Sequence, residues 1–383
     1  MLSQSSLLLP IMLVSAASVA FALLPEARAE EPRLSGPFTH DNLTIFLVHG
    51  KSAEGPVPLT LDEALAKGKI SVHETGSVSE LQIENEGDEE VFVHAGDIVK
   101  GGKQDRVVTS SLIMKGKSGR VPLSVFCVER GRWAARGGED VQQFASAKEM
   151  MPSREAKIAM KVRAAPPEAP AATASASAAV QQEAEDRLET LQSAGRTDRG
   201  SARLAAEPSR PSPQSEVWRS VSNIQTALSG NLGATVTASE SETSLQLALE
   251  NEKLAAAQKA YIDALASAGE KDGDAVGYVF AVNGRINSGD IYASNALFKK
   301  LWPKLLKAAA TEAIGAAKSL PKAIDPTAAA VDLFLAEAAA GKKSEMPSID
   351  GQRLETREAD ATLDYMTARA TGEVVHRNVL ARH

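Results

Sequence analysis

The residues from His94 to Arg106 form the densest polar run in the strand-rich part of the sequence, and their types suit the binding of a small ligand. The run reads HAGDIVKGGKQDR, and its paired glycines let the backbone approach another group closely. The lysine, glutamine and arginine that follow offer N–H donors and a guanidinium fork to an anionic or hydroxylated molecule. The alternative is a bulged connection between strands, whose polar side chains only satisfy nearby backbone groups. The candidate ligand-binding residues of this run are Asp97, Gly101, Gly102, Lys103, Gln104, Asp105 and Arg106.

A second cluster follows the strand-like run VPLSVFCVE, where Glu129, Arg132 and Trp133 lie in close succession. A carboxylate beside an aromatic ring is typical of sites that bind sugars or aromatic molecules. We therefore include these three residues in the candidate ligand site. In the alternative interpretation, Trp133 covers the core and Glu129 forms a structural ion pair with an arginine.

Cys127 and three carboxylates support the alternative hypothesis of an enzyme. Strand alternation places Cys127 on the same face as two aliphatic residues, so the simpler interpretation is a small apolar side chain inside a buried strand. A thiol enzyme would need a base or a cation beside the sulfur to form the thiolate. A hydrolase would need Asp97, Asp105 and Glu129 to be brought together in environments that separate their pKa values.

The histidines follow no spacing that binds a metal. Without H-x-H, H-E-x-x-H or a Cys/His pattern, a metal site would have to be assembled from distant positions, so the sequence predicts neither a metal nor a cofactor. His94 shares a strand face with Phe92, which indicates a packed side chain. The sequence also lacks a phosphate-binding loop and a G-x-S-x-G nucleophile elbow. The histidines are His40, His49, His73, His94, His376 and His383.

Composition and the first residues set the expected cellular context. The chain has 383 residues and a net charge of −7, without a Lys/Arg cluster, so we expect no nucleic-acid partner. Residues 7–24 are apolar, and Ala27-Arg28-Ala29 supplies the small residues that signal peptidase requires. We therefore predict a cleaved secretory signal over residues 1–29 and a periplasmic or extracellular mature chain with no stable membrane span. The alternative is an uncleaved anchor formed by the same apolar segment.

An interval without aromatic residues, between Phe144 and Trp218, divides the remainder of the chain. Its Ala, Pro, Ser, Gln and Glu residues bury too little apolar surface to offset the entropy of ordering, which predicts a disordered insertion at residues 164–214. Before it, residues 36–150 carry short strand-like runs, typical of an antiparallel sheet or sandwich. After it, residues 215–383 combine helical patterns with a hairpin. The predicted fold class is therefore α+β, with helices packed on a further hairpin in the second half.

Local signals place several elements. Asn283-Gly284 between two apolar runs predicts a tight hairpin. Residues 244–269 carry apolar side chains at helical spacing and predict one helix that ends at Gly269. The expected helix starts are Thr60 with its capping partner Glu63, Ser294, and Asp325-Pro326. The expected strands are residues 69–74, 78–85, 89–95, 106–114 and 121–129.

Several of these segments are similar to a known family. The helix TLDEALAKG, the run VHETGSVSELQIENEGDEEVFVHAGDIVKGGKQDR and the run VPLSVFCVERGRW resemble the ARG and rhodanese-phosphatase-superfamily-associated protein domain, a domain of unknown function. QSEVWRSVSNI, VNGRINSGDIY and GEVVHRN resemble its second half. The resemblance implies that residues 36–150 and 215–383 form one domain, from which residues 164–214 loop out. The family name records genomic association, so the resemblance implies neither phosphatase nor sulfurtransferase activity.

We therefore expect an exported binding or interaction module whose ligand site is the polar, glycine-rich run. Its partner would be a small molecule, a glycan or a protein. The alternative is a hydrolase or thiol enzyme that uses Cys127 or the cluster of Asp97, Asp105 and Glu129.

Overall fold

A computed structural model describes residues 33–134, 136, 144–161, 212–318, 321–346 and 349–382. The predicted signal at residues 1–29 and nearly all of the predicted insertion lie outside the described residues. Residues Pro32–His383 form one compact unit. Of the described residues, 33% are helical and 35% lie in strands, and the large sheets are antiparallel, which confirms the predicted α+β class.

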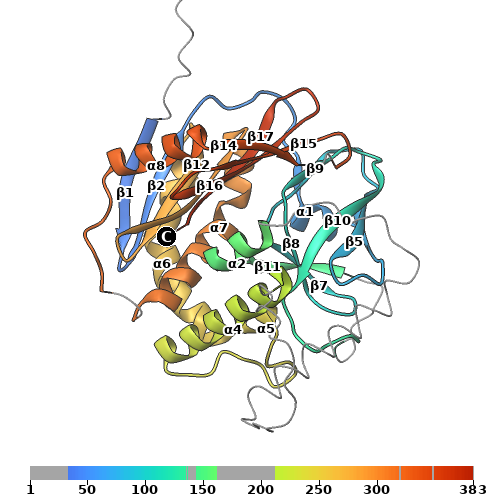
Figure 1. Cartoon of the computed structure of the whole chain (residues 1–383), viewed down its shortest axis with the longest axis horizontal. Coiled ribbons are helices and arrows are strands. Elements are labelled where there is room, and N and C mark those ends of the chain that lie inside the picture. The colour runs from blue at the N-terminus through green and yellow to red at the C-terminus, as the bar shows by residue number, and fades with distance from the viewer. Residues whose placement is uncertain are drawn as a thin grey trace, which may run out of the picture. The chain divides into compact units, whose positions relative to one another are not determined.

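The largest sheet has eight strands and combines both ends of the sequence (Figure 1). Its order is β1-β2-β12-β13-β17-β16-β15-β14, and each neighbouring pair is antiparallel. The predicted hairpin, β12–β13, therefore lies near the middle of a sheet that extends beyond it on both sides. The strands are β1 (Arg33–His40), β2 (Leu43–His49), β12 (Ala275–Val282), β13 (Arg285–Tyr292), β14 (Lys342–Met346), β15 (Arg353–Glu358), β16 (Thr362–Ala368) and β17 (Val374–Ala381).

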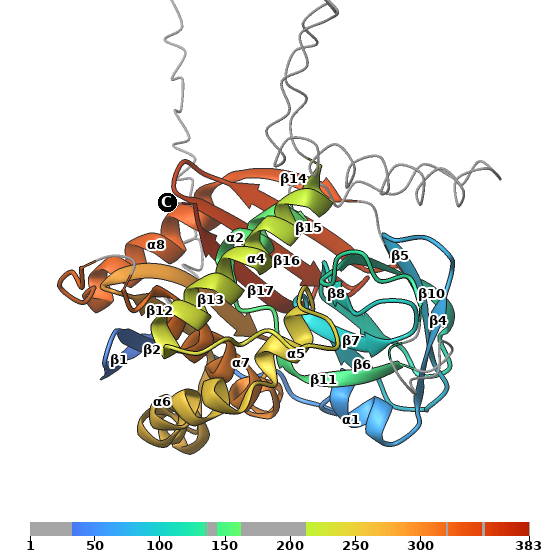
Figure 2. The same cartoon turned by 90° about the horizontal axis from the view of Figure 1, so that it is seen from below.

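The first half of the sequence builds two further sheets, which lie beside the large one (Figure 2). The larger of the two is antiparallel and has the order β11-β7-β8-β10-β5-β4, whereas the smaller has the order β3-β6-β9 and contains the parallel pair β3–β6. Their strands are β3 (Leu59–Thr60), β4 (Ile70–Glu74), β5 (Glu80–Asn85), β6 (Val91–Val93), β7 (Asp97–Gly101), β8 (Arg106–Val108), β9 (Leu112–Met114), β10 (Gly119–Cys127) and β11 (Phe144–Met150).

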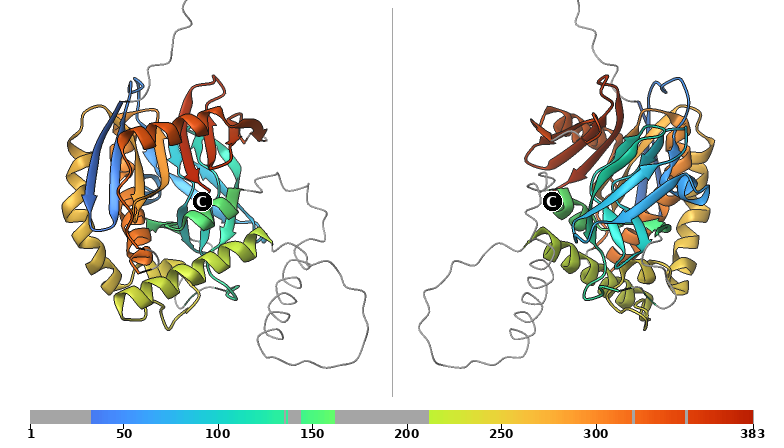
Figure 3. Two further views of the ribbon diagram at one scale, coloured as in Figure 1. Left: turned by 60° about the vertical axis from the view of Figure 1, so that its left-hand side comes forward. Right: turned by 90° about the vertical axis from the view of Figure 1, so that its right-hand side faces the viewer.

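Helices cover both faces of the eight-stranded sheet (Figure 3). Alternate residues of β12 face opposite ways: Tyr278 packs against α7, while Val279 packs against α8. Among the described residues, no helix combines the length and apolar character needed to span a membrane. The helices are α1 (Leu61–Ala66), α2 (Arg154–Lys161), α4 (Pro213–Leu232), α5 (Leu245–Leu249), α6 (Glu252–Lys271), α7 (Asn295–Ala316) and α8 (Ala328–Ala340).

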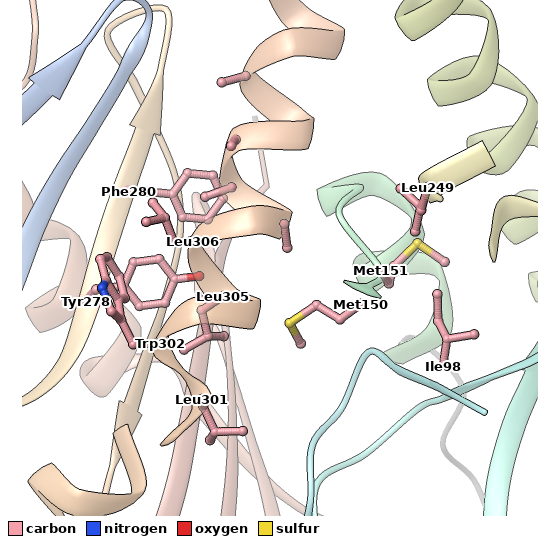
Figure 4. Packing of buried hydrophobic residues seen from close by; sticks show 14 of the residues in the cluster. Ile98, Met150, Met151, Leu249, Tyr278, Phe280, Leu301, Trp302, Leu305 and Leu306 are labelled. Carbon is pink, nitrogen blue, oxygen red and sulfur yellow. The ribbon is translucent and has the colours of Figure 1, made fainter. Parts of the chain in front are cut away.

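The main hydrophobic core draws on both halves of the sequence. Tyr278 and Phe280 of β12 stack at 5.8 Å between ring centroids, and the Trp302 ring of α7 meets Tyr278 edge-on (Figure 4). Ile98 and Met150 reach the same core from β7 and β11. Because these side chains are almost completely removed from water, helix α7 is held from both sides.

Several local predictions are confirmed. Thr60 and Glu63 form the expected capping box at the start of α1. Asn283 and Gly284 have φ angles of 52° and 76°, as the central residues of a type I′ hairpin turn require. The Ser294 side chain accepts a hydrogen bond from a backbone N–H of the first turn of α7, as a helix N-cap does.

Other boundaries differ because side chains cap the backbone elsewhere. Residues 244–269 form two helices, since the Asn251 side chain accepts hydrogen bonds from two N–H groups and starts α6. Helix α6 continues past Gly269 to Lys271. Helix α8 begins after Thr327 rather than at Asp325, because the Thr327 hydroxyl caps the first turn.

The strand prediction for residues 106–114 and the start of the second half also needed correction. Residues 106–108 and 112–114 belong to different sheets, and the Thr109 backbone between them bonds to Ser124. Helix α4 begins at Pro213, just inside the range predicted for the insertion, where the Ser212 side chain caps it.

Replacing Gly269 tests how tightly α6 packs against α7. A Cβ at this position would lie 2.5 Å from carbons of the Trp302 ring, so the ring or the helix must shift. We expect Gly269→Ala to lower the free energy of unfolding by about 1–3 kcal/mol in urea titrations, although alanine favours helices.

Gly273→Ala is the matched control, because nothing lies within 4 Å of its new Cβ. It should change the free energy of unfolding by no more than about 0.5 kcal/mol. Equal effects of the two substitutions would contradict the close packing of Gly269 on Trp302.

Candidate functional site

Arg106 is the centre of the candidate site. Its side chain is fully buried, and none of its three guanidinium nitrogens has a hydrogen-bond partner in the described part of the chain. Strand β8 places Arg106 between Val99 of β7 and Cys127 of β10, in the interior of the six-stranded sheet. The Trp133 ring lies beside the guanidinium, with 5.5 Å from Cζ to the ring centroid. A buried charge without a partner costs several kcal/mol, so this environment favours an additional acceptor.

Unpartnered acceptors accompany the unpartnered donors. Within the described residues, Gln104 Oε1 and Glu74 Oε2 are buried and make no hydrogen bond. Glu129 Oε1 makes no hydrogen bond either, but it lies 3.7 Å from Arg136 Nη1 in an ion pair. Arg106, Glu74 and Glu129 all lie close enough to the Cys127 thiol to influence its pKa electrostatically. The site therefore contains both donors and acceptors whose hydrogen-bonding capacity is not used.

The two glycines let the loop between β7 and β8 approach its neighbours closely. Gly101 and Gly102 have φ angles of 116° and 56°, which residues with a Cβ rarely adopt. A Cβ on Gly102 would overlap the Phe144 ring. The close approach lets the Lys103 N–H donate to Glu74 Oε1 at 2.9 Å, and the Gly101 N–H to Asp105 at 3.1 Å.

Asp105 and Glu129 are fully buried and are committed to ion pairs. Arg132 Nε donates to Glu129 at 2.6 Å and its Nη2 to Asp105 at 3.4 Å, while Arg136 Nη1 lies 3.2 Å from Asp105. The Ser244 hydroxyl also donates to Asp105. Burial raises the pKa of Asp105, although the nearby arginines oppose this. The two carboxylates and two arginines balance one another in charge.

Asp97 lies apart from the other predicted ligand residues. The interactions described above connect residues 101–106 with Glu129, Arg132 and Trp133, whereas Asp97 Oδ1 accepts a hydrogen bond from Lys304 Nζ of α7 at 2.8 Å. Burial alone would lower the pKa of Lys304, but attraction by Asp97 and Asp62 outweighs it and raises this pKa. Asp97 is therefore engaged in holding β7 against α7.

Cys127 is placed as a packed side chain. It is fully buried, and its Sγ lies 3.6 Å from the carbonyl oxygen of Val78. Burial raises the pKa of its thiol to about 11. The Gln214 side chain bonds to both the N–H and the carbonyl of Cys127, which fixes this end of β10. In the described residues, Asp97 bonds to Lys304, and Asp105 and Glu129 are in ion pairs with arginines.

The sequence prediction missed Glu74, Arg136, Ser244 and Gln246. Glu74 ends β4, whereas Ser244 and Gln246 lie at the start of α5, and both Ser244 and Gln246 contact Arg136. These contacts join segments far apart in the sequence, and no local pattern signals them. Only the position of Arg136, shortly after the run CVERGRW, pointed towards the site.

The family model of the ARG and Rhodanese-Phosphatase-superfamily-associated Protein domain matches residues 31–380. The chain belongs to this family, which confirms the resemblance seen in its sequence segments. Neither a curated protein nor a solved structure matches the chain.

Alkylation of Cys127, the single cysteine of the chain, tests whether the site holds a reactive thiol. With a thiol pKa of about 11, the folded protein contains little thiolate at pH 8. We expect iodoacetamide to react at least about 100-fold more slowly than with free cysteine, because only the thiolate is the nucleophile. The rate should rise towards pH 11 and recover in denaturant. Labelling of the folded protein as fast as free cysteine would contradict the burial of the thiol and support the thiol-enzyme hypothesis.

Proposed function

We propose that this member of the family is an exported binding module that holds a small hydroxylated anion at Arg106, beneath Trp133. The observation that carries the proposal is the Arg106 guanidinium, fully buried yet without a hydrogen-bond partner among the described residues. A carboxylate or phosphate group on a ligand would supply two acceptors to the guanidinium fork in a bidentate pair.

Charge in the site favours an anion. Asp105 and Glu129 are balanced by Arg132 and Arg136. Lys103 Nζ and Arg106 Cζ lie 5.1 Å and 5.5 Å from the centroid of the same Trp133 ring, with Glu74 as the remaining nearby carboxylate. Two cations against one anion leave an excess positive charge, which an anionic ligand would neutralise.

Hydroxyl groups on the ligand would complete the hydrogen bonding. Gln104 Oε1 and Glu74 Oε2 can only accept, and both are buried without a donor within the described residues. A bare phosphate or carboxylate offers acceptors and would leave these two atoms unsatisfied. A sugar acid or a sugar phosphate carries an oxyanion and hydroxyl donors in one molecule, so its chemistry fits both requirements.

Trp133 controls access in this proposal. Its side chain follows β10 and is 38% exposed, whereas Arg106 beneath it has no exposed surface. In the proposed mode of binding, the indole ring moves aside when a ligand reaches Arg106 and then packs against a sugar face. Binding should accordingly alter tryptophan fluorescence.

Export is part of the proposal and is supported by the apolar segment and the Ala27-Arg28-Ala29 pattern. The mature chain should begin at Glu30, which N-terminal sequencing of the exported protein measures. A mature protein that keeps residues 1–29 would contradict cleavage and favour an anchor.

Arg106→Met tests the binding site. In the ligand-free protein, this substitution should raise the free energy of unfolding by about 1–4 kcal/mol, because it removes an unpaired buried charge and keeps a similar volume. Glucuronate or glucose 6-phosphate should raise the Tm of the unsubstituted protein, and neither should raise the Tm of the variant. Comparing the two probes distinguishes a carboxylate from a phosphate, and glucose tests the need for a charge.

Arg120→Met is the matched control, since Arg120 lies on the neighbouring strand β10 with an exposed side chain. Its effect on unfolding should stay within about 0.5 kcal/mol, and it should leave ligand stabilisation intact. The proposal fails if Arg106→Met destabilises the ligand-free protein, or if that variant keeps the full ligand response.

A further inference from the structure

We propose a second site, which binds a first-row transition-metal dication such as Zn²⁺ through His94, Asp290 and His376. His94 lies between β6 and β7, Asp290 on β13 and His376 on β17, so only the folded chain brings them together. All three side chains are buried, and their potential ligand atoms lie within 4.8 Å of one another. His94 also packs against Phe92, as its strand position predicted.

The spacing of the donor atoms is close to that of a metal site. Asp290 Oδ1 lies 3.7 Å from His94 Nε2 and 3.0 Å from His376 Nε2. Bonds of about 2.0–2.1 Å at tetrahedral angles would separate such donors by roughly 3.4 Å. Small side-chain shifts therefore suffice, and the metal would replace the proton between His376 and Asp290.

Neighbouring groups hydrogen-bond to His94 and Asp290 and orient their side chains, as is common for the ligands of a metal ion. His94 Nδ1 lies 2.6 Å from the Ala95 carbonyl oxygen, which can only accept, so Nδ1 carries the proton and Nε2 keeps its lone pair. That lone pair faces Asp290 and the Tyr292 hydroxyl. Asn378 donates to Asp290 Oδ1 at 2.8 Å. Such hydrogen bonds commonly fix the ring and carboxylate orientations of metal ligands.

A cavity of about 20 Å³ is lined by one of the three residues, His376, together with Asn378 and Lys161. Hydroxyl groups of Ser111 and Thr367 also belong to its polar wall. A polar cavity of this size holds a water molecule. Three protein ligands with a water at the fourth position are typical of a zinc site with an open coordination position.

His49, Asp272 and Asp274 form another group of potential ligands, but its Asp274 also belongs to an exposed ion pair. The Asp274 side chain is 56% exposed and pairs with Arg33 at 2.6 Å. The His49 ring nitrogens bond to Asp274 and Ser35, and this group offers one imidazole where the other offers two. This group serves as the internal control.

Metal titration of the mature protein tests the proposal. After treatment with a chelator, the protein should bind one equivalent of Zn²⁺ in calorimetry and of Co²⁺ by visible absorption. Asp290→Asn and His94→Gln should weaken Zn²⁺ binding at least 100-fold, more than the roughly 10–100-fold typical of losing an outer-shell partner. His49→Gln should leave the affinity unchanged.

X-ray absorption of the Zn²⁺-loaded, unsubstituted protein gives an answer even if a variant fails to fold. Two imidazole ligands are expected, whereas the His49 group could supply only one. The proposal is overturned if the spectrum shows fewer than two imidazoles or if the folded protein binds no Zn²⁺. It is also overturned if folded Asp290→Asn keeps the full affinity for Zn²⁺, or if His49→Gln loses Zn²⁺ binding.

Discussion

The Asp97 carboxylate holds together the parts of the molecule on which both proposed sites depend. Its Oδ1 lies 2.8 Å from Lys304 Nζ of the central helix α7, and its Oδ2 accepts the His94 N–H at 2.9 Å. Asp62 of α1 provides a second anion for the same ammonium group. Removing one partner of such a buried pair typically costs about 3–5 kcal/mol, because the other charge remains without compensation. This carboxylate therefore fixes β7, which has His94 just before its start and the loop with Gly101 and Gly102 at its end.

Lys304 and Arg106 are both buried cations, but they differ in whether a carboxylate pairs with them. Lys304 is nearly inaccessible and has two carboxylate partners, so its charge serves the packing of α7. Arg106 is equally buried, yet its nitrogens have no such partner in the described residues, although Asp105 and Glu129 lie nearby in pairs with other arginines. A protein gains no stability from an arrangement of this kind. The difference between the two cations is the reason to assign Arg106 to a ligand.

Contiguity in sequence explains how much of the site was predictable. Residues 101–106 lie in one loop and the strand that follows it. Their glycines and polar side chains indicated a potential ligand site, because neighbours in the sequence are also neighbours in the structure here. The same local physics made the α1 capping box and the Asn283-Gly284 turn predictable. Asp97 was grouped with the loop because it is near in sequence, but its strand directs the carboxylate towards α7.

Contacts between distant segments were not predictable from one sequence. Glu74 and Arg136 join the proposed ligand site through sheet pairing and through α5, which no spacing rule encodes. The group of His94, Asp290 and His376 depends on the packing of the β6–β7 connection against the face of the large sheet. The sequence therefore shows no metal motif, because the three residues lie in separate segments of the chain and have no regular spacing.

A high-resolution crystal structure of the protein, grown with the sugar acid or sugar phosphate that stabilises it most, tests the Arg106 site most directly. We expect two ligand oxygens within hydrogen-bond distance of the Arg106 nitrogens, ligand hydroxyls on Gln104 and Glu74, and a displaced Trp133 ring. A guanidinium paired directly with Glu74 or Glu129, with no ligand density beneath Trp133, would contradict it and make Arg106 a structural residue.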